Sequence, residues 1–166
     1  MVIVFDMALY WVVLGLVLVA ELEAASHHGV SQSRLLAAIG KSMDMCREES
    51  KLTTDMLQDW SKIWEKDFEV KHREFGCTLK CMAKNLAVLE DGAMHDGKLS
   101  GFMSNIHDDE DMTSKSTNLI LNCHNQAADI DDECDRFAQT FRCYKAGLDT
   151  AGHTPYAELI RDLLNE

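Results

Sequence analysis

The sequence predicts one all-α domain whose helices are cross-linked by disulfides, and three observations support that prediction. Proline occurs once in 166 residues, at Pro155, and few segments alternate between apolar and polar residues as strands do. Apolar residues instead recur at helical spacing in several stretches. Six cysteines are enough to join the helices covalently. A chain of this length suits one domain with a core of its own.

The first element in chain order is an apolar stretch that indicates export. Residues 7–20 carry no charge and are too few for a comfortable membrane span, and small residues follow at positions 24–26. We therefore predict a signal peptide over residues 1–25 and a mature domain over residues 26–166. The alternative is a signal anchor that stays in the membrane, because Asp6 stands where a signal peptide usually carries Lys or Arg.

Four stretches of the mature part have the spacing of amphipathic helices, each with one apolar face. We predict helices over residues 54–68, 77–89, 114–128 and 133–148. The acidic and glycine-containing segments between them are predicted to be loops, at residues 90–97, 107–111 and 129–132. A last helix is predicted to start at Pro155, and its apolar stripe needs a groove because so short a helix is marginal alone in water.

An even number of cysteines behind a secretory signal predicts three disulfides. The cysteines are Cys46, Cys77, Cys81, Cys123, Cys134 and Cys143. Zinc ligation is the alternative, but no second close pair accompanies Cys77 and Cys81 to complete a tetrahedral site. These two lie one turn apart on a helix, and Cys134 and Cys143 point to opposite sides of another, so neither pair is expected to bond internally. Several of the fifteen connectivities stay open.

The formal net charge of −12 argues against nucleic acid and against anionic membrane surfaces as partners. The sequence contains no Gly-x-Ser-x-Gly, HExxH or P-loop motif, and we expect no enzyme activity, no cofactor and no metal. A secreted lipid hydrolase is the enzyme alternative, because Cys123 and His124 form a helix-borne Cys-His pair. It is weakened by the absence of a glycine-rich calcium loop.

The spacing C-x30-C-x3-C-x41-C-x10-C-x8-C closely resembles that of insect odorant-binding proteins. The segments between the cysteines are similar to the pheromone-binding and general-odorant-binding branch of moths, without deciding between these subgroups. They are CREES (46–50), WEKDF (64–68), HREFGC (72–77) and DDECDR (131–136). The resemblance implies six helices around an apolar cavity. It also implies the bridges Cys46–Cys81, Cys77–Cys134 and Cys123–Cys143.

The resemblance further implies an extracellular carrier of small hydrophobic odorants or pheromones, such as long-chain alcohols, aldehydes or acetates. Such a carrier works in antennal sensillum lymph and delivers its ligand to olfactory receptors at the dendrite membrane. A homodimer at neutral pH is left open. A non-olfactory carrier of fatty acids or other lipophilic ligands is the leading alternative.

Alignment on the cysteines gives a set of mostly apolar positions that match the family's pocket, as a hydrocarbon ligand requires. They are Ile39, Ile63, Trp64, Leu79, Ala83, Val88, Met94, Phe102, Ile120, Phe137 and Tyr144. Spacing alone would favour ordinary core packing for each of them. Arg136 matches an arginine that bonds the ligand's oxygen in the general-odorant-binding subgroup, and its alternative is a solvated surface residue.

In this family a comparable C-terminal tail fills the pocket at acid pH and expels the ligand. Here Glu158, Asp162 and Glu166 would lose their charge on acidification, which lowers the cost of burying the tail. The family's lid is held by two histidines, and this chain has other residues at both positions. His95 is the candidate switch that remains beside the first, so we predict a weaker response or one set by the tail carboxylates.

Overall fold

The computed structural model describes residues 35, 37–60, 62–63, 65, 67–107 and 109–152. The predicted signal peptide, Trp64, and the tail with Glu158, Asp162 and Glu166 lie outside the described residues. Within that part the chain is mostly helical, as predicted. None of its helices combines the length and the apolar character that crossing a membrane requires.

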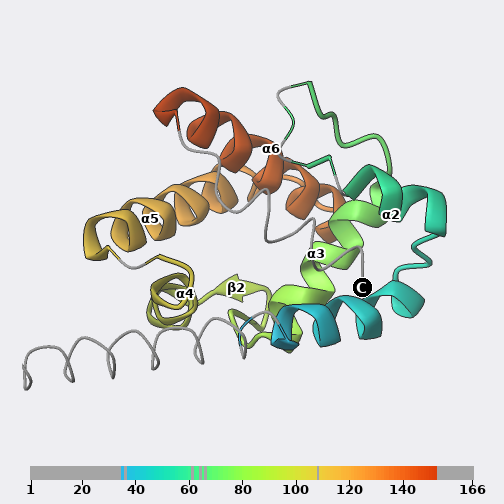
Figure 1. Ribbon diagram of the computed structural model, residues 1–166, viewed down its shortest axis with the longest axis horizontal. Coiled ribbons are helices and arrows are strands. Elements are labelled where there is room, and N and C mark those ends of the chain that lie inside the picture. The colour runs from blue at the N-terminus through green and yellow to red at the C-terminus, as the bar shows by residue number, and fades with distance from the viewer. Residues whose placement is uncertain are drawn as a thin grey trace, which may run out of the picture. The chain divides into compact units, whose positions relative to one another are not determined.

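The elements follow one another as a mostly helical chain with one short antiparallel pair of strands (Figure 1). They are a helix over residues 37–49, α2 (Thr54–Trp60), α3 (Arg73–Asn85), β1 (Leu89–Glu90), β2 (Ala93–Met94), α4 (Asp96–Ser104), α5 (Glu110–Gln126) and α6 (Glu133–Ala151). Helix α6 packs against both α3 and α5, and α5 packs against α4. Helix α6 therefore lies in contact with α3 on one hand and with the α4–α5 pair, through α5, on the other.

Aspartate caps set the starts of the two longest helices. The Asp109 side chain accepts hydrogen bonds from the backbone N–H of Asp111 and of Met112, so α5 begins four residues before the predicted position 114. Asp132 accepts from Asp135 N–H at 3.0 Å and caps α6 at the predicted start. The loop predicted over residues 129–132 thus ends in a cap, whereas the last two residues of the loop predicted over 107–111 already belong to α5.

Helix α2 is shorter than predicted, because it ends at Trp60 rather than at Phe68. Beyond Trp60 the backbone switches to bonds between residues three apart, including Ile63 N–H to Trp60 O at 3.2 Å and Phe68 N–H to Glu65 O at 3.1 Å. These tight turns still bury Ile63, and they bring the Phe68 ring to 5.9 Å from that of Phe75. In this segment a series of turns, instead of a continuous helix, buries the apolar side chains.

The predicted helix over residues 77–89 ends early, at Asn85, and the loop predicted over residues 90–97 is a hairpin followed by α4. Ala87 has φ of 58°, which turns the chain out of the helix and sends Leu89 into β1. Asp91 and Gly92 form the hairpin turn, with φ of 51° and 79°. Positive φ at both positions is what a two-residue hairpin turn of type I′ requires.

The three disulfides are those that the resemblance implies, and all six cysteines are paired. Cys46–Cys81 ties the helix over residues 37–49 to α3, Cys77–Cys134 ties α3 to α6, and Cys123–Cys143 ties α5 to α6. Neither Cys77–Cys81 nor Cys134–Cys143 forms, as helix geometry predicts. Every helix that carries a cysteine is thus covalently joined to another.

Helices α3 and α6 lie very close together beside the second of these bonds. Gly76 of α3 lies against the backbone of α6, and a Cβ there would overlap the Cys134 carbonyl oxygen and crowd the Ala138 nitrogen. The Cα atoms of Cys77 and Cys134 are 4.4 Å apart. Only glycine leaves room for two backbones this near each other.

Replacing Gly76 with alanine should therefore push α3 away from α6. We expect Gly76→Ala to lower the free energy of unfolding by about 2 kcal/mol, the usual cost of overpacking. Gly101→Ala is the matched control, because a Cβ at Gly101 in α4 meets no atom within 4 Å and should leave stability unchanged or slightly raised. Urea titration of both variants measures the difference. Equal stability of the two variants would contradict this view of the crossing.

Candidate ligand-binding site

Two clusters of apolar side chains fill the described part of the protein. The first, called the Trp60 cluster, buries Cys46, Leu52, Trp60, Ile63, Phe75, Cys81 and Met82. The second, called the Ile120 cluster, buries Ala83, Val88, Leu89, Leu99, Met103, Ile120 and Phe137. Partly buried side chains of Met94, Phe102, Ile106, Leu121 and Tyr144 pack against the Ile120 cluster. Leu79 packs against both clusters.

Most of the predicted ligand-binding residues come together in the Ile120 cluster. Those that do so are Leu79, Ala83, Val88, Met94, Phe102, Ile120, Phe137 and Tyr144. Ile39 and Ile63 belong instead to the Trp60 cluster. The residues of the Ile120 cluster come from α3, the hairpin, α4, α5 and α6, so several distant segments of the chain meet there. Their role in ligand binding stays a prediction.

Helix periodicity places the predicted residues of each helix on one face of that helix. Leu79 and Ala83 are one turn apart on α3, and Phe137 and Tyr144 are two turns apart on α6. On α5, Ile120 lies one turn before Cys123, whose disulfide to Cys143 holds the residue next to Tyr144. The disulfide therefore fixes the register between the two helices that carry Ile120 and Tyr144.

Polar groups lie next to these apolar side chains. Burial raises the pKa of Tyr144 to about 12, and a hydrogen bond with Ser116 opposes that shift. Ser116 is 2% exposed, and its Oγ lies 3.0 Å from Nε2 of His107. Sequence reasoning did not single out Ser116, although its position one turn before Ile120 on the predicted helix would place it on the same face.

His124 on α5 is buried against α6, and it also bonds the backbone of the hairpin turn. Its ring centroid is 5.3 Å from that of Phe137, and its Nδ1 is 3.4 Å from Thr140 Oγ1. Burial, followed by the positive charge of Arg136, lowers the pKa of His124, whereas a hydrogen bond to the backbone of Gly92 raises it. The histidine therefore favours its neutral form in the folded protein.

The predicted switch residue His95 has a different environment. It is half-exposed at the start of α4, and its Nε2 lies 3.2 Å from Glu90 Oε2. Lys98 shares the same carboxylate at 2.6 Å, and Lys98 and His95 together lower the pKa of Glu90. The His124 ring thus lies against the predicted pocket residue Phe137, whereas the His95 ring pairs with Glu90. The tail carboxylates of the predicted switch lie outside the described residues.

Two nitrogen atoms of the Arg136 guanidinium bond the backbone of a nearby residue. Its Nε and Nη2 donate to the carbonyl oxygen of Ile130 at 3.0 and 2.8 Å, which ties α6 to the loop before it. The guanidinium carries further donors, so its predicted contact with a ligand oxygen stays a prediction. Among the described residues, no three His, Cys, Asp or Glu side chains are grouped as a metal site would need.

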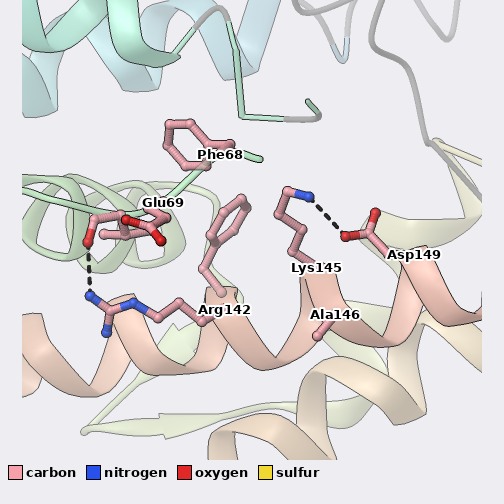
Figure 2. Close-up of a pocket in the computed structure, with 8 residues that line it drawn as sticks. Phe68, Glu69, Arg142, Lys145, Ala146 and Asp149 are labelled. Carbon is pink, nitrogen blue, oxygen red and sulfur yellow. Dashed lines mark hydrogen bonds and ion pairs between the residues drawn. The ribbon is translucent and has the colours of Figure 1, made fainter. Parts of the chain in front are cut away.

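A separate pocket of about 390 Å³ lies between the segment at residues 68–70 and the last turns of α6 (Figure 2). Its apolar side is made by Phe68, Val70 and Phe141, which belong to the Trp60 cluster. Lys145 pairs with Asp149 at 2.9 Å along its edge. None of the predicted ligand-binding residues lines this pocket, and it is called the outer pocket below.

Comparison with known proteins agrees with the sequence resemblance. Residues 30–147 match the PBP/GOBP family. General odorant-binding protein 2 of Antheraea pernyi is 33% identical over 135 residues, which cover 81% of this chain and 84% of that protein. Pheromone-binding protein 2 of Epiphyas postvittana is 24% identical over 120 residues, which cover 72% and 73%.

Among solved structures, that of Epiphyas postvittana pheromone-binding protein 3 has a similar fold. The TM-score is 0.61 at 22% identity, and the match covers 66% of this chain and 95% of that one. At this identity the likeness concerns the fold, which is the helical, disulfide-linked class that the sequence predicts.

Stability is expected to depend on pH through His124. The pKa of His124 in the folded protein lies below the ordinary 6.5. The unfolded chain therefore binds more protons than the folded protein as the pH falls through 6.5. The free energy of unfolding should therefore decrease from about pH 7 to pH 5. Denaturant titrations of His124→Gln should show a smaller decrease than the wild type. His72→Gln, which removes a half-exposed histidine, is the control and should show the same decrease in stability as the wild type. An equally large decrease in His124→Gln would contradict this account.

Proposed function

The chain belongs to the PBP/GOBP family, and from this premise we propose that it is an extracellular carrier that binds and solubilises small hydrophobic odorants or pheromones. One observation carries the proposal: most of the residues expected to meet the ligand gather in the Ile120 cluster. The three disulfides fit an extracellular protein. The relatives are named as odorant-binding and pheromone-binding proteins, which fits a non-enzyme.

Apolar burial supplies the affinity in this proposal. Each methylene that leaves water contributes about 0.8 kcal/mol, so a long aliphatic chain binds well in a site lined by aliphatic and aromatic side chains. We propose long-chain alcohols, aldehydes and acetates as the ligand class. The place of action is antennal sensillum lymph, and the destination is an olfactory receptor at the dendrite membrane.

We also propose that acid pH releases the ligand through the C-terminal tail. Residues 156–164 carry an apolar stripe, and the carboxylates of Glu158, Asp162 and Glu166 oppose its burial while they are charged. Protonation removes this opposition, so the tail then competes with the ligand for apolar contacts. His95, which is half-exposed beside Glu90, is the histidine candidate for the same switch.

The carrier function predicts that affinity rises with chain length. In displacement of the fluorescent probe N-phenyl-1-naphthylamine, each added methylene of a primary alcohol should strengthen binding about fourfold until the chain fills the site. Met45→Ala, which alters an exposed apolar residue outside the Ile120 cluster, should give the same series. Affinity that is independent of chain length, or failure of the probe to bind, would contradict the function.

The tail proposal predicts weaker binding of dodecanol at about pH 5 than at about pH 7, because protonated carboxylates favour burial of the tail. Deleting residues 154–166 should abolish that difference. The triple variant Glu158→Gln, Asp162→Asn and Glu166→Gln imitates the protonated tail and should bind weakly at both pH values. A pH response that survives the deletion would show that the tail is not its cause.

A further inference from the structure

The first half of α5 buries three hydroxyl-bearing side chains. Thr113, Ser116 and Thr117 are buried in the first half, and Ile120 follows them. Thr117 bonds within the helix, to the carbonyl oxygen of Thr113 at 2.7 Å. Ser116 instead bonds away from its own helix, toward His107 and Tyr144. A row of three polar groups from different segments therefore lies beside the Ile120 cluster.

The same three residues are tied to the apolar side chains of that cluster. Tyr144 packs against the cluster itself, and Ser116 is one turn from Ile120. His107 follows directly on Ile106, another residue that packs there. The backbone N–H of His107 donates to Met103 O at 2.9 Å, which holds it near the end of α4. These three polar groups therefore lie beside the apolar side chains of the Ile120 cluster.

We propose that the Tyr144 hydroxyl, positioned by Ser116 and His107, binds the oxygen of the apolar ligand. The inference rests on the carrier function and names the part of the ligand that this protein recognises. Burial makes such a bond important, because a ligand oxygen that moves from water to an apolar site without a hydrogen-bond partner weakens binding.

The direction of the bonds selects among head groups. In one arrangement His107 Nε2–H donates to Ser116, and the Ser116 hydroxyl donates to the Tyr144 oxygen. The Tyr144 O–H is then left to donate to the ligand, which must supply an acceptor. In the opposite arrangement the Tyr144 O–H donates to Ser116, and Ser116 donates to His107. The Tyr144 oxygen then accepts from the ligand, which must supply a donor. An alcohol meets either arrangement, whereas an aldehyde meets only the first and a hydrocarbon meets neither. The expected order of affinity is alcohol, then aldehyde, then hydrocarbon.

Arg136 is the competing anchor. Two of its donors already bond the Ile130 carbonyl oxygen, and its charge lies near enough to His124 to lower the pKa of that residue. Tyr144 and Arg136 are separated by more than two helical turns on α6, so they belong to different parts of that helix. Substituting each one in turn distinguishes the two anchors.

The experiment measures displacement of N-phenyl-1-naphthylamine by dodecanol, dodecanal and dodecane. Tyr144→Phe removes one oxygen and should weaken dodecanol binding about three- to tenfold while leaving dodecane within about twofold. Ser116→Ala should lower the ratio of dodecanol to dodecane affinity by a smaller factor, because the hydroxyl remains but loses its orientation. Arg136→Gln should leave that ratio unchanged.

Thr78→Val is the matched control, since it removes a fully buried hydroxyl that bonds Ser50 and lies outside the Ile120 cluster. Its ratio of dodecanol to dodecane affinity should equal that of the wild type. Parallel losses of dodecanol and dodecane in Tyr144→Phe, or a selective loss in Arg136→Gln alone, would overturn the anchor and leave the carrier function intact. A wild type that binds none of the three ligands would overturn both.

Discussion

The close crossing of α3 and α6 at Gly76 is the constraint on which the rest of the described structure depends. Glycine lets the α3 backbone lie against the Cys134 carbonyl, and the Cys77–Cys134 disulfide fixes that contact. From the crossing, α3 carries Leu79 and Ala83 into the Ile120 cluster, and α6 carries Phe137 and Tyr144. A shift of either helix would move one half of the candidate site relative to the other.

Covalent cross-links suit a protein whose interior has to receive another molecule. Each disulfide contributes about 3–4 kcal/mol in the chain-entropy account by restricting the unfolded chain. That contribution does not require dense packing at the site itself. The three bonds here join four helices, and Cys123–Cys143 holds α5 and α6 in register beside Ile120 and Tyr144. In the proposed site, the apolar residues between these helices are the ones that would contact the ligand.

The sequence predicted the helices whose apolar faces are regular and missed what depends on local turns. The stripe on α5, with Ile120, Cys123 and His124, is buried as its spacing predicts. The hairpin was missed although Asp91–Gly92 is a typical two-residue turn, because its strands are only two residues long. Helix α4 was missed because its glycines and polar residues weaken the helical signal. The row of Ser116, Tyr144 and His107 depends on tertiary packing, which spacing within one helix does not contain.

Localising the ligand tests the account most directly, because the described residues include two separate groups of apolar side chains, the Ile120 cluster and the lining of the outer pocket. The measurement is a set of intermolecular nuclear Overhauser effects between protein methyl groups and the chain of bound dodecanol. The account predicts contacts to the methyls of Leu79, Ala83 and Ile120 in the Ile120 cluster. Contacts confined to Val70 and Ala146, which line the outer pocket, would contradict it.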